Sequence, residues 1–156
     1  MGIALAIVGA ALSVALAGIG SAIGVGMAGE SGAGVTSQKS ELFGKVLLLQ
    51  ALPATQGIYG FLGAFWVLLK LGLLSGAPAV INAGTGWQIL FACLPVALGG
   101  LVSAIFQGRV CVAGLHMIVK DEANAGKGVI MAAMVETYAV LGLLASILLI
   151  NGIKVG

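Results

Sequence analysis

The sequence predicts an all-α membrane protein with four transmembrane helices, arranged as a duplicated parallel helical hairpin. Of its 156 residues 60% are hydrophobic and 8% charged, with a mean hydropathy of +1.19, whereas soluble domains carry about 25% charged residues. A membrane span needs about 20 mostly apolar residues. Four such runs are present, at 3–28, 46–69, 87–105 and 129–150. They are long and lack the alternation of barrel strands, so we expect helices.

The first run is expected to remain in the protein as a helix. No Lys or Arg precedes it, and it is longer than the apolar core of about 7–15 residues in a signal peptide. Small residues recur along it every four positions in two rows, Gly18–Ala22–Gly26 and Gly20–Gly24–Ala28–Gly32. Since Gly in a helix costs about 1 kcal/mol relative to Ala, this density indicates close helix packing. Two rows fit a ring crowded on both sides, or a pairing face within one subunit.

The second run contains a proline flanked by polar side chains. It follows a short polar turn, Ser37–Glu41, in which Ser40 is expected to cap the next helix. Pro53 removes one helical hydrogen bond, so carbonyl oxygens near it can turn toward a ligand. Thr55 and Gln56 add side-chain oxygens at the same depth. Both could instead be structural, with Thr55 bonded to its own helix and Gln56 to another helix.

The last two runs carry the polar residues that matter most. Gln107 is a second amide at bilayer depth, and Arg109 could pair with Glu30 or extend to the membrane interface. Glu136 is the one charged residue within 129–149. An ionised side chain at the bilayer centre costs roughly 2.5–3.5 kcal/mol, so it persists where function requires it. We therefore take Glu136 as the functional centre.

The distribution of lysines predicts the topology. Lysines bracket the first and third connections, at Lys39 and Lys45 and at Lys120 and Lys127. By the positive-inside rule, loops 36–44 and 120–127 are expected in the cytoplasm and both termini on the extracytoplasmic side. The net charge of +2 is too small to suggest a nucleic-acid partner.

The chain contains an internal repeat in which 18–62 aligns with 100–144 without gaps. The coinciding residues include Gly18/Gly100, Ser21/Ser103, Gly26/Gly108, Gly44/Gly126, Lys45/Lys127, Thr55/Thr137 and Gly60/Gly142. We therefore predict two hairpins of the same orientation, at 1–72 and 87–156, joined by an extracytoplasmic connection at 73–86. Glu136 falls opposite Ala54, so the first hairpin has no carboxylate at the equivalent position. Repeats packed side by side tend to continue around an axis, which predicts a closed ring.

Several motifs support a family resemblance that covers essentially the whole chain. They are the duplicated glycine-rich hairpin, the stretches 52–59 (LPATQGIY) and 131–139 (MAAMVETYA), and Phe106-Gln107-Gly108. Together they resemble the proteolipid (K, or c-type) subunit of bacterial V-type ATPases. The resemblance implies identical copies in a lipid-embedded rotor ring in a bacterial cell membrane. It also implies two kinds of partner: a stator membrane subunit with an essential Arg, and central stalk subunits coupled to an ATP-hydrolysing head.

Sodium-carrying members of this family imply a ligand set. The matching residues are the Glu136 carboxylate, the amide oxygens of Gln56 and Gln107, the Thr55 hydroxyl and the Leu52 backbone carbonyl, with Tyr59 hydrogen-bonded to the carboxylate. Ala54 departs from the Gly common before the Thr. The residue types also favour Na⁺ independently, because a hard cation needs a shell of oxygens whereas a proton needs little beyond the carboxylate. The same rotor carrying H⁺ remains the alternative.

The chain itself is expected to be a non-catalytic subunit. It has no GxxxxGK[ST] phosphate loop, so ATP chemistry would belong to other subunits. Two other functions stay open. A small four-helix proton-coupled exchanger would use Glu136 but leaves the parallel repeat and paired amides unexplained. A structural or pore-forming proteolipid would tolerate Glu136→Gln.

Overall fold

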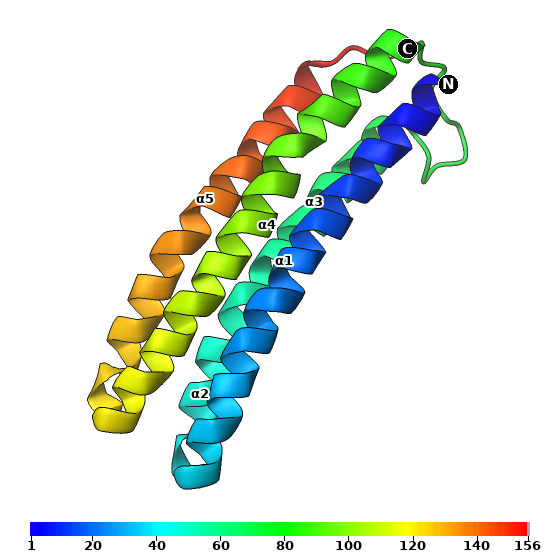
Figure 1. Cartoon of the computed structure of the whole chain (residues 1–156). Helices are drawn as coiled ribbons and strands as arrows, with labels where there is room; N and C mark the ends of the chain where they lie inside the picture. The colour runs from blue at the N-terminus through cyan, green and yellow to red at the C-terminus, as the bar shows by residue number, and fades with distance from the viewer. Residues whose placement is uncertain (156) are drawn as a thin grey trace.

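Two long antiparallel hairpins lie side by side in the computed structural model, which describes residues 1–155 (Figure 1). The first hairpin comprises α1 (Gly2–Gln38), η1 (Ser40–Leu42), α2 (Phe43–Ala51), η2 (Leu52–Ala54) and α3 (Thr55–Lys70). The second comprises α4 (Ala83–Lys120), η3 (Glu122–Asn124) and α5 (Ala125–Gly152). Four helical segments, 2–38, 40–70, 83–120 and 122–152, are long and apolar enough to cross a membrane. The predicted all-α membrane fold is confirmed.

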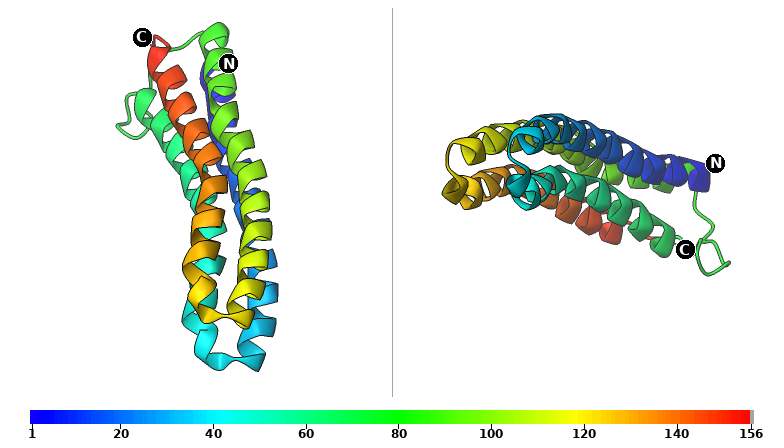
Figure 2. Two further views of the ribbon diagram at one scale, coloured as in Figure 1. Left: turned by 90° about the vertical axis from the view of Figure 1, so that its left-hand side faces the viewer. Right: turned by 90° about the horizontal axis from the view of Figure 1, so that it is seen from below.

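The helices form two layers, with both chain ends at one end of the bundle and both hairpin tips at the other. Seen from the end, α1 and α4 make up one layer, while α3 and α5 make up the other (Figure 2). α1 and α4 share the most extensive contact in the chain. They run in the same direction, as a parallel repeat of hairpins requires (Figure 1).

One of the two predicted glycine rows accounts for the close contact between α1 and α4. A Cβ added at Gly20 would collide with the backbone of Leu101, and one added at Gly24 would also collide with α4 backbone. The other row is free, because a Cβ at Gly18 or Gly26 would meet no atom within 4 Å. The chain therefore uses one small-residue face internally and leaves the second without a partner among the described residues.

Two buried apolar clusters stabilise the bundle, one toward each end. The cluster toward the chain ends contains Ala6, Ala10, Ala64, Val67, Leu71, Ile89, Ala92, Cys93 and Ile150. The cluster toward the hairpin tips contains Ala28, Val35, Leu42, Val46, Leu49, Cys111, Leu115, Ile118 and Ala132. Gln56 and Gln107, both 0% exposed, lie between the two clusters along their helices. The fold therefore encloses a polar layer between two apolar ones.

Helix boundaries differ from the expectations in three places. Ser40 does not cap a helix: it begins η1, and α2 starts at Phe43 with no side-chain cap. α4 begins earlier than the apolar run because the Asn82 side chain accepts a hydrogen bond of 2.8 Å from the Thr85 backbone N–H. α1 and α4 also continue past their apolar runs to Gln38 and Lys120. The length of an apolar run corresponds to the thickness of the bilayer, whereas the helix itself continues beyond that run until a turn interrupts it.

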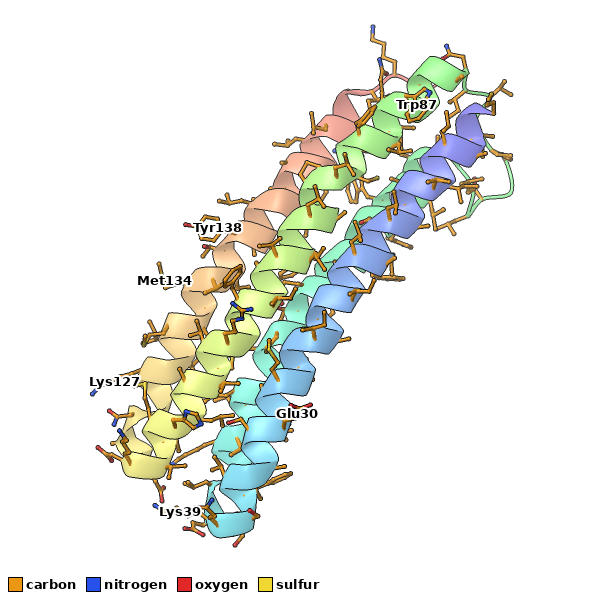
Figure 3. All side chains as sticks on the ribbon, in the orientation of Figure 1. Glu30, Lys39, Trp87, Lys127, Met134 and Tyr138 are labelled. Carbon is orange, nitrogen blue, oxygen red and sulfur yellow. The ribbon has the colours of Figure 1, made fainter. Side chains whose placement is uncertain are left out.

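Charged side chains gather at the tips and link the two hairpins. Lys45 Nζ lies 2.6 Å from a carboxylate oxygen of Glu122, the only ion pair within residues 1–155. Both partners are exposed, so the pair contributes about 1 kcal/mol or less. Within residues 1–155 Arg109 forms no ion pair with Glu30; its guanidinium carbon lies 5.1 Å from the centroid of the Phe106 ring. Figure 3 shows Lys39 and Lys127 at the tip end and Trp87 at the opposite end.

Candidate cation site

Glu136 lies half-buried on α5 and receives hydrogen bonds from both hairpins. The Tyr59 hydroxyl on α3 donates to Oε1 at 2.5 Å. The Gln107 amide on α4 donates from Nε2 to Oε2 at 3.3 Å. Within residues 1–155 no Lys, Arg or His forms an ion pair with this carboxylate. Its charge therefore needs compensation from outside the chain, by a cation or a proton.

The two amides form the centre of the site. Gln56 Nε2 donates to Gln107 Oε1 at 2.5 Å, which joins the first hairpin to the second. Gln107 Nε2 also donates to the Ala132 carbonyl on α5 at 3.1 Å. Both glutamines are fully buried, so loss of either partner would leave an unsatisfied polar group costing about 1–3 kcal/mol. The pair fixes the distance between the hairpins at the depth of Glu136.

Pro53 shapes the remaining part of the site. Because proline has no N–H, the second membrane-spanning segment, 40–70, changes from α-helix to the short 3₁₀ segment η2 at this point. The Thr55 backbone N–H and its hydroxyl both donate to the Leu52 carbonyl, the hydroxyl at 3.0 Å. Thr55 Oγ1 also lies 3.3 Å from Gln56 Oε1. The single hydroxyl hydrogen serves one acceptor at a time, so Thr55 links the Leu52 carbonyl to the amide network.

The structure thus brings all six predicted site residues into one hydrogen-bonded network, comprising Leu52, Thr55, Gln56, Tyr59, Gln107 and Glu136. Its acceptors are carboxylate, amide, hydroxyl and carbonyl oxygens. Such oxygens are the ligands of hard cations, whereas sulfur and imidazole ligands suit transition metals. The donor set therefore fits an ion such as Na⁺.

An apolar surface cavity of about 390 Å³ lies beside the site. Its lining is Ala133, Glu136, Thr137, Val140 and Leu141, all on α5. The carboxylate is therefore reached from the outer face of α5, while the amides lie behind it in the bundle. This arrangement allows a group outside the chain to approach Glu136 without passing between the helices.

The sequence did not single out two serines that hydrogen-bond to the backbone of the second membrane-spanning segment, 40–70. Ser21 Oγ accepts a hydrogen bond of 2.7 Å from the Gly57 backbone N–H, next to Gln56. Ser13 Oγ donates to the Gly60 carbonyl at 2.7 Å. Both lie on α1 opposite the disturbed stretch around Pro53. The signal was available, since a proline inside a membrane helix raises the question of which groups satisfy the backbone nearby.

Comparison with known proteins places the chain among rotary ATPase subunits. The ATP synthase C-subunit family matches it twice, at residues 8–67 and 90–149, in the same register as the internal repeat. The chain is 45% identical over 149 residues to the V-type sodium ATPase subunit K of Enterococcus hirae, covering 96% of this chain and 92% of that protein. It is 41% identical over 152 residues to the A-type ATP synthase subunit K of Methanocaldococcus jannaschii, covering 97% of this chain and 64% of that protein.

Proposed function

Since this chain belongs to the ATP synthase C-subunit family, we propose that it is the rotor-ring subunit of a V-type ATPase that binds Na⁺ and carries it across the membrane. Rotation would be coupled to ATP hydrolysis or synthesis in other subunits. The observation that carries this proposal is the network joining Glu136 to the buried amides of Gln56 and Gln107. The sodium ATPase named among its relatives supports the choice of ion.

The proposed assembly contains identical copies in a ring surrounded by lipid. A stator membrane subunit would supply an essential Arg, and central stalk subunits would transmit rotation. The chain would be non-catalytic, in a bacterial cell membrane, with loops 36–44 and 120–127 cytoplasmic and both termini extracytoplasmic. The lysines at the hairpin tips support this orientation (Figure 3). The division at 1–72, 73–86 and 87–156 stays a prediction.

The network explains how the chain would hold Na⁺ as its transported substrate. A half-turn about the last torsion of a glutamine exchanges its amide oxygen and nitrogen, so Gln56 and Gln107 can both present oxygen to a cation. The Glu136 carboxylate would neutralise the ion, and Thr55 and the Leu52 carbonyl would complete the oxygen shell. Tyr59 would keep the carboxylate in place through its hydrogen bond to Oε1.

Neutralisation is what would let the ring turn through lipid. With Na⁺ bound the site carries no net charge, so the penalty for placing Glu136 against hydrocarbon falls. At the stator, an Arg approaching through the apolar cavity on α5 would displace the ion. Each charge moved across the membrane contributes about 2.3 kcal/mol per 100 mV, so several ions must pass for each ATP.

The test is to measure the mass and the sodium content of the purified oligomer in mild detergent. Native mass spectrometry should show a large ring, and equilibrium dialysis with radioactive sodium should show one Na⁺ bound per chain. A ring that binds no sodium at neutral pH would indicate the H⁺-carrying alternative. A dimer would contradict the rotor and support an exchanger.

A further inference from the structure

The end of the bundle that carries both chain ends has lysines but no acidic side chains. Lys70 is the last residue of α3, and Lys154 follows α5. The acidic residues of the chain, all at mid-depth or nearer the hairpin tips, are Glu30, Glu41, Asp121, Glu122 and Glu136. In the proposed orientation the lysine end is extracytoplasmic, where the positive-inside rule predicts few lysines. Neither cation has an acidic side chain to pair with, which points to a partner outside the chain.

Both lysines belong to the layer formed by α3 and α5. Lys70 Nζ donates to the backbone carbonyl of Asn151 at 3.3 Å, which joins the end of α3 to the end of α5. Ile153 and Val155 pack against the buried cluster toward the chain ends, and Lys154 between them is exposed. Because an ammonium group has three N–H donors, Lys70 retains two after its bond to Asn151. These donors are available to a ligand at the edge of the bundle.

Helix length places both lysines at the level of lipid headgroups. At 1.5 Å per residue, Lys70 lies about 21 Å beyond Gln56 along its helix, and Asn151 lies about 22 Å beyond Glu136. Half a bilayer measures about 15 Å of hydrocarbon, or about 20–22 Å with its headgroups. With Glu136 at the bilayer centre, Lys70 and Lys154 therefore reach the depth of the lipid phosphates.

Trp66 marks the boundary between hydrocarbon and headgroups on the same face. It lies about 15 Å beyond Gln56 and one helical turn before Lys70. Trp side chains are enriched at this boundary. The Trp66 indole N–H donates to Asn151 Oδ1 at 3.0 Å, so Asn151 binds Trp66 through its side chain and Lys70 through its carbonyl. These two contacts hold the indole and the ammonium group beside each other.

Apolar side chains cover the same layer on the membrane side of the lysines. Leu148 is 71% exposed, Leu69 and Leu149 are about half exposed, and Phe65 is 38% exposed. The surface therefore changes with depth, from ammonium groups to an indole and then to hydrocarbon side chains. An amphiphile with an anionic head above apolar chains has its groups in the matching order.

We propose that Lys70, Lys154 and Trp66 form a binding site for an anionic phospholipid of the extracytoplasmic leaflet, here called the rim site. The lysines bind the phosphate, and the acyl chains lie along the apolar surface below Trp66. The inference rests on the proposed function for the orientation of the chain and for the exposure of α3 and α5 to lipid. It adds a lipid class and the residues that recognise it.

The proposed ring favours lipid over protein as the occupant. Every copy carries a rim site, so the occupant must be present around the whole circumference, as lipid is. A fixed stator subunit would meet only a few copies at any moment. Net charge then selects the class of lipid. Phosphatidylglycerol carries an uncompensated phosphate, whereas the choline of phosphatidylcholine cancels the phosphate charge and would face the lysines with a cation.

Tryptophan quenching in the intact oligomer tests the rim site. The chain has two tryptophans, Trp66 and Trp87, so Trp87→Phe leaves Trp66 as the only indole. The oligomer of this variant is reconstituted into vesicles of phosphatidylcholine and phosphatidylglycerol in varied ratio, with brominated acyl chains on one lipid or the other. Bromine quenches indole fluorescence on contact, so the quenching shows which lipid lies beside Trp66.

Brominated phosphatidylglycerol should quench Trp66 more strongly than brominated phosphatidylcholine. The expected preference is about fivefold for each lysine that binds the phosphate. Adding Lys70→Gln and Lys154→Gln should bring the ratio of the two lipids to about one. The matched control, Lys120→Gln with Lys127→Gln, removes the same charge at the hairpin tips and should leave the ratio unchanged.

Three results would overturn the rim site. Equal quenching by the two lipids would show no selection, and a preference that is lost equally in the tip control would reflect overall charge. Absence of quenching by either lipid would show that protein covers Trp66. Each of these results in an oligomer that is a ring by native mass leaves the rotor intact. A chain that forms no ring overturns the proposed function, and the same quenching measurement still decides the rim site.

Discussion

The two hairpins share one helical register but differ in what they contribute at the depth of Glu136. In the first hairpin the second membrane-spanning segment is interrupted at Pro53, and it supplies the Thr55 hydroxyl and the Gln56 amide. The second hairpin keeps α5 regular and supplies the carboxylate and the Gln107 amide. Neither hairpin alone contains the network. The two hairpins therefore divide the site between them, with the carboxylate in the second and the distorted backbone in the first.

This division has a physical consequence for a membrane protein. One carboxylate per four helices keeps the number of charges that must be neutralised in hydrocarbon at one. The amides contribute oxygens without adding charge. If both hairpins carried a carboxylate at this depth, each hairpin would need its own ion before its carboxylate could face lipid. In the proposed ring, the difference between the hairpins would therefore set how many ions are carried.

Moving the carboxylate between the hairpins should have the largest effect. Glu136→Gln removes the only charge in the network, and losing one partner of a buried charge pair costs about 3–5 kcal/mol, more than about a hundredfold in Na⁺ affinity. Adding Ala54→Glu restores a carboxylate at the repeat-equivalent position, but no amides surround it. Equilibrium dialysis should show no bound Na⁺ for the single and the double variant. Recovery in the double variant would mean that the two hairpins are interchangeable as the source of the carboxylate.

A smaller loss is expected when an amide is removed. Gln56→Ala deletes a fully buried side chain that donates to Gln107, leaving an unsatisfied group worth about 1–3 kcal/mol, roughly 5–150-fold in Na⁺ affinity. Gln50→Ala is the matched control, since Gln50 lies in the same membrane-spanning segment, 40–70, and its side chain makes no hydrogen bond within residues 1–155. Sodium titrations of both variants measure the difference. Equal effects would show that the amides act only in packing.

The two tyrosines give a finer comparison. Tyr59→Phe removes one hydrogen bond to Glu136, while Gln107 still donates to the other oxygen. We expect Na⁺ affinity to fall by about 1 kcal/mol, roughly fivefold. Tyr138→Phe, at an exposed position of the second hairpin, should leave affinity unchanged. The same sodium titration tests both, and a loss in Tyr138→Phe alone would contradict the assignment of Tyr59.

The smallest effect concerns the paired serines of the repeat. Ser21 Oγ accepts a hydrogen bond from Gly57 N–H, whereas Ser103 Oγ, its repeat equivalent, is buried without a partner in the described chain. Ser21→Ala should lower the free energy of unfolding by about 1 kcal/mol, and Ser103→Ala should change it by less than about 0.5 kcal/mol. Thermal denaturation of the purified oligomer can measure both. A larger loss at Ser103 would show that the hydroxyl finds a partner in the assembly.

The features that the sequence predicts well are those set by composition and repetition. Apolar run length predicts four helices, and the match of 18–62 to 100–144 predicts two equivalent hairpins. Glu136 stands out because charge is costly in lipid. These signals depend on one residue or one pattern at a time, so no knowledge of neighbouring helices is needed.

Features that depend on contacts between distant segments could not be predicted in the same way. Gln50 and Gln56 are both amides in one apolar run, so the residue type alone does not separate them; the family resemblance singled out Gln56, and the packing of α4 is what brings it into the network. Likewise, nothing in the sequence shows that Lys45 meets Glu122 across the two hairpin tips. The wrong cap at Ser40 has the same cause, since a short polar turn allows several hydrogen-bonding patterns.

The central claim is that Glu136 and the amides of both hairpins form one sodium site. The most direct test is carbodiimide labelling of Glu136 in the purified oligomer across a sodium titration, with potassium as the control, because this reagent modifies a protonated carboxyl in an apolar site. We predict that Na⁺ protects Glu136 from labelling and K⁺ does not. Rapid labelling that is indifferent to sodium would contradict the claim and assign the amides a purely structural role.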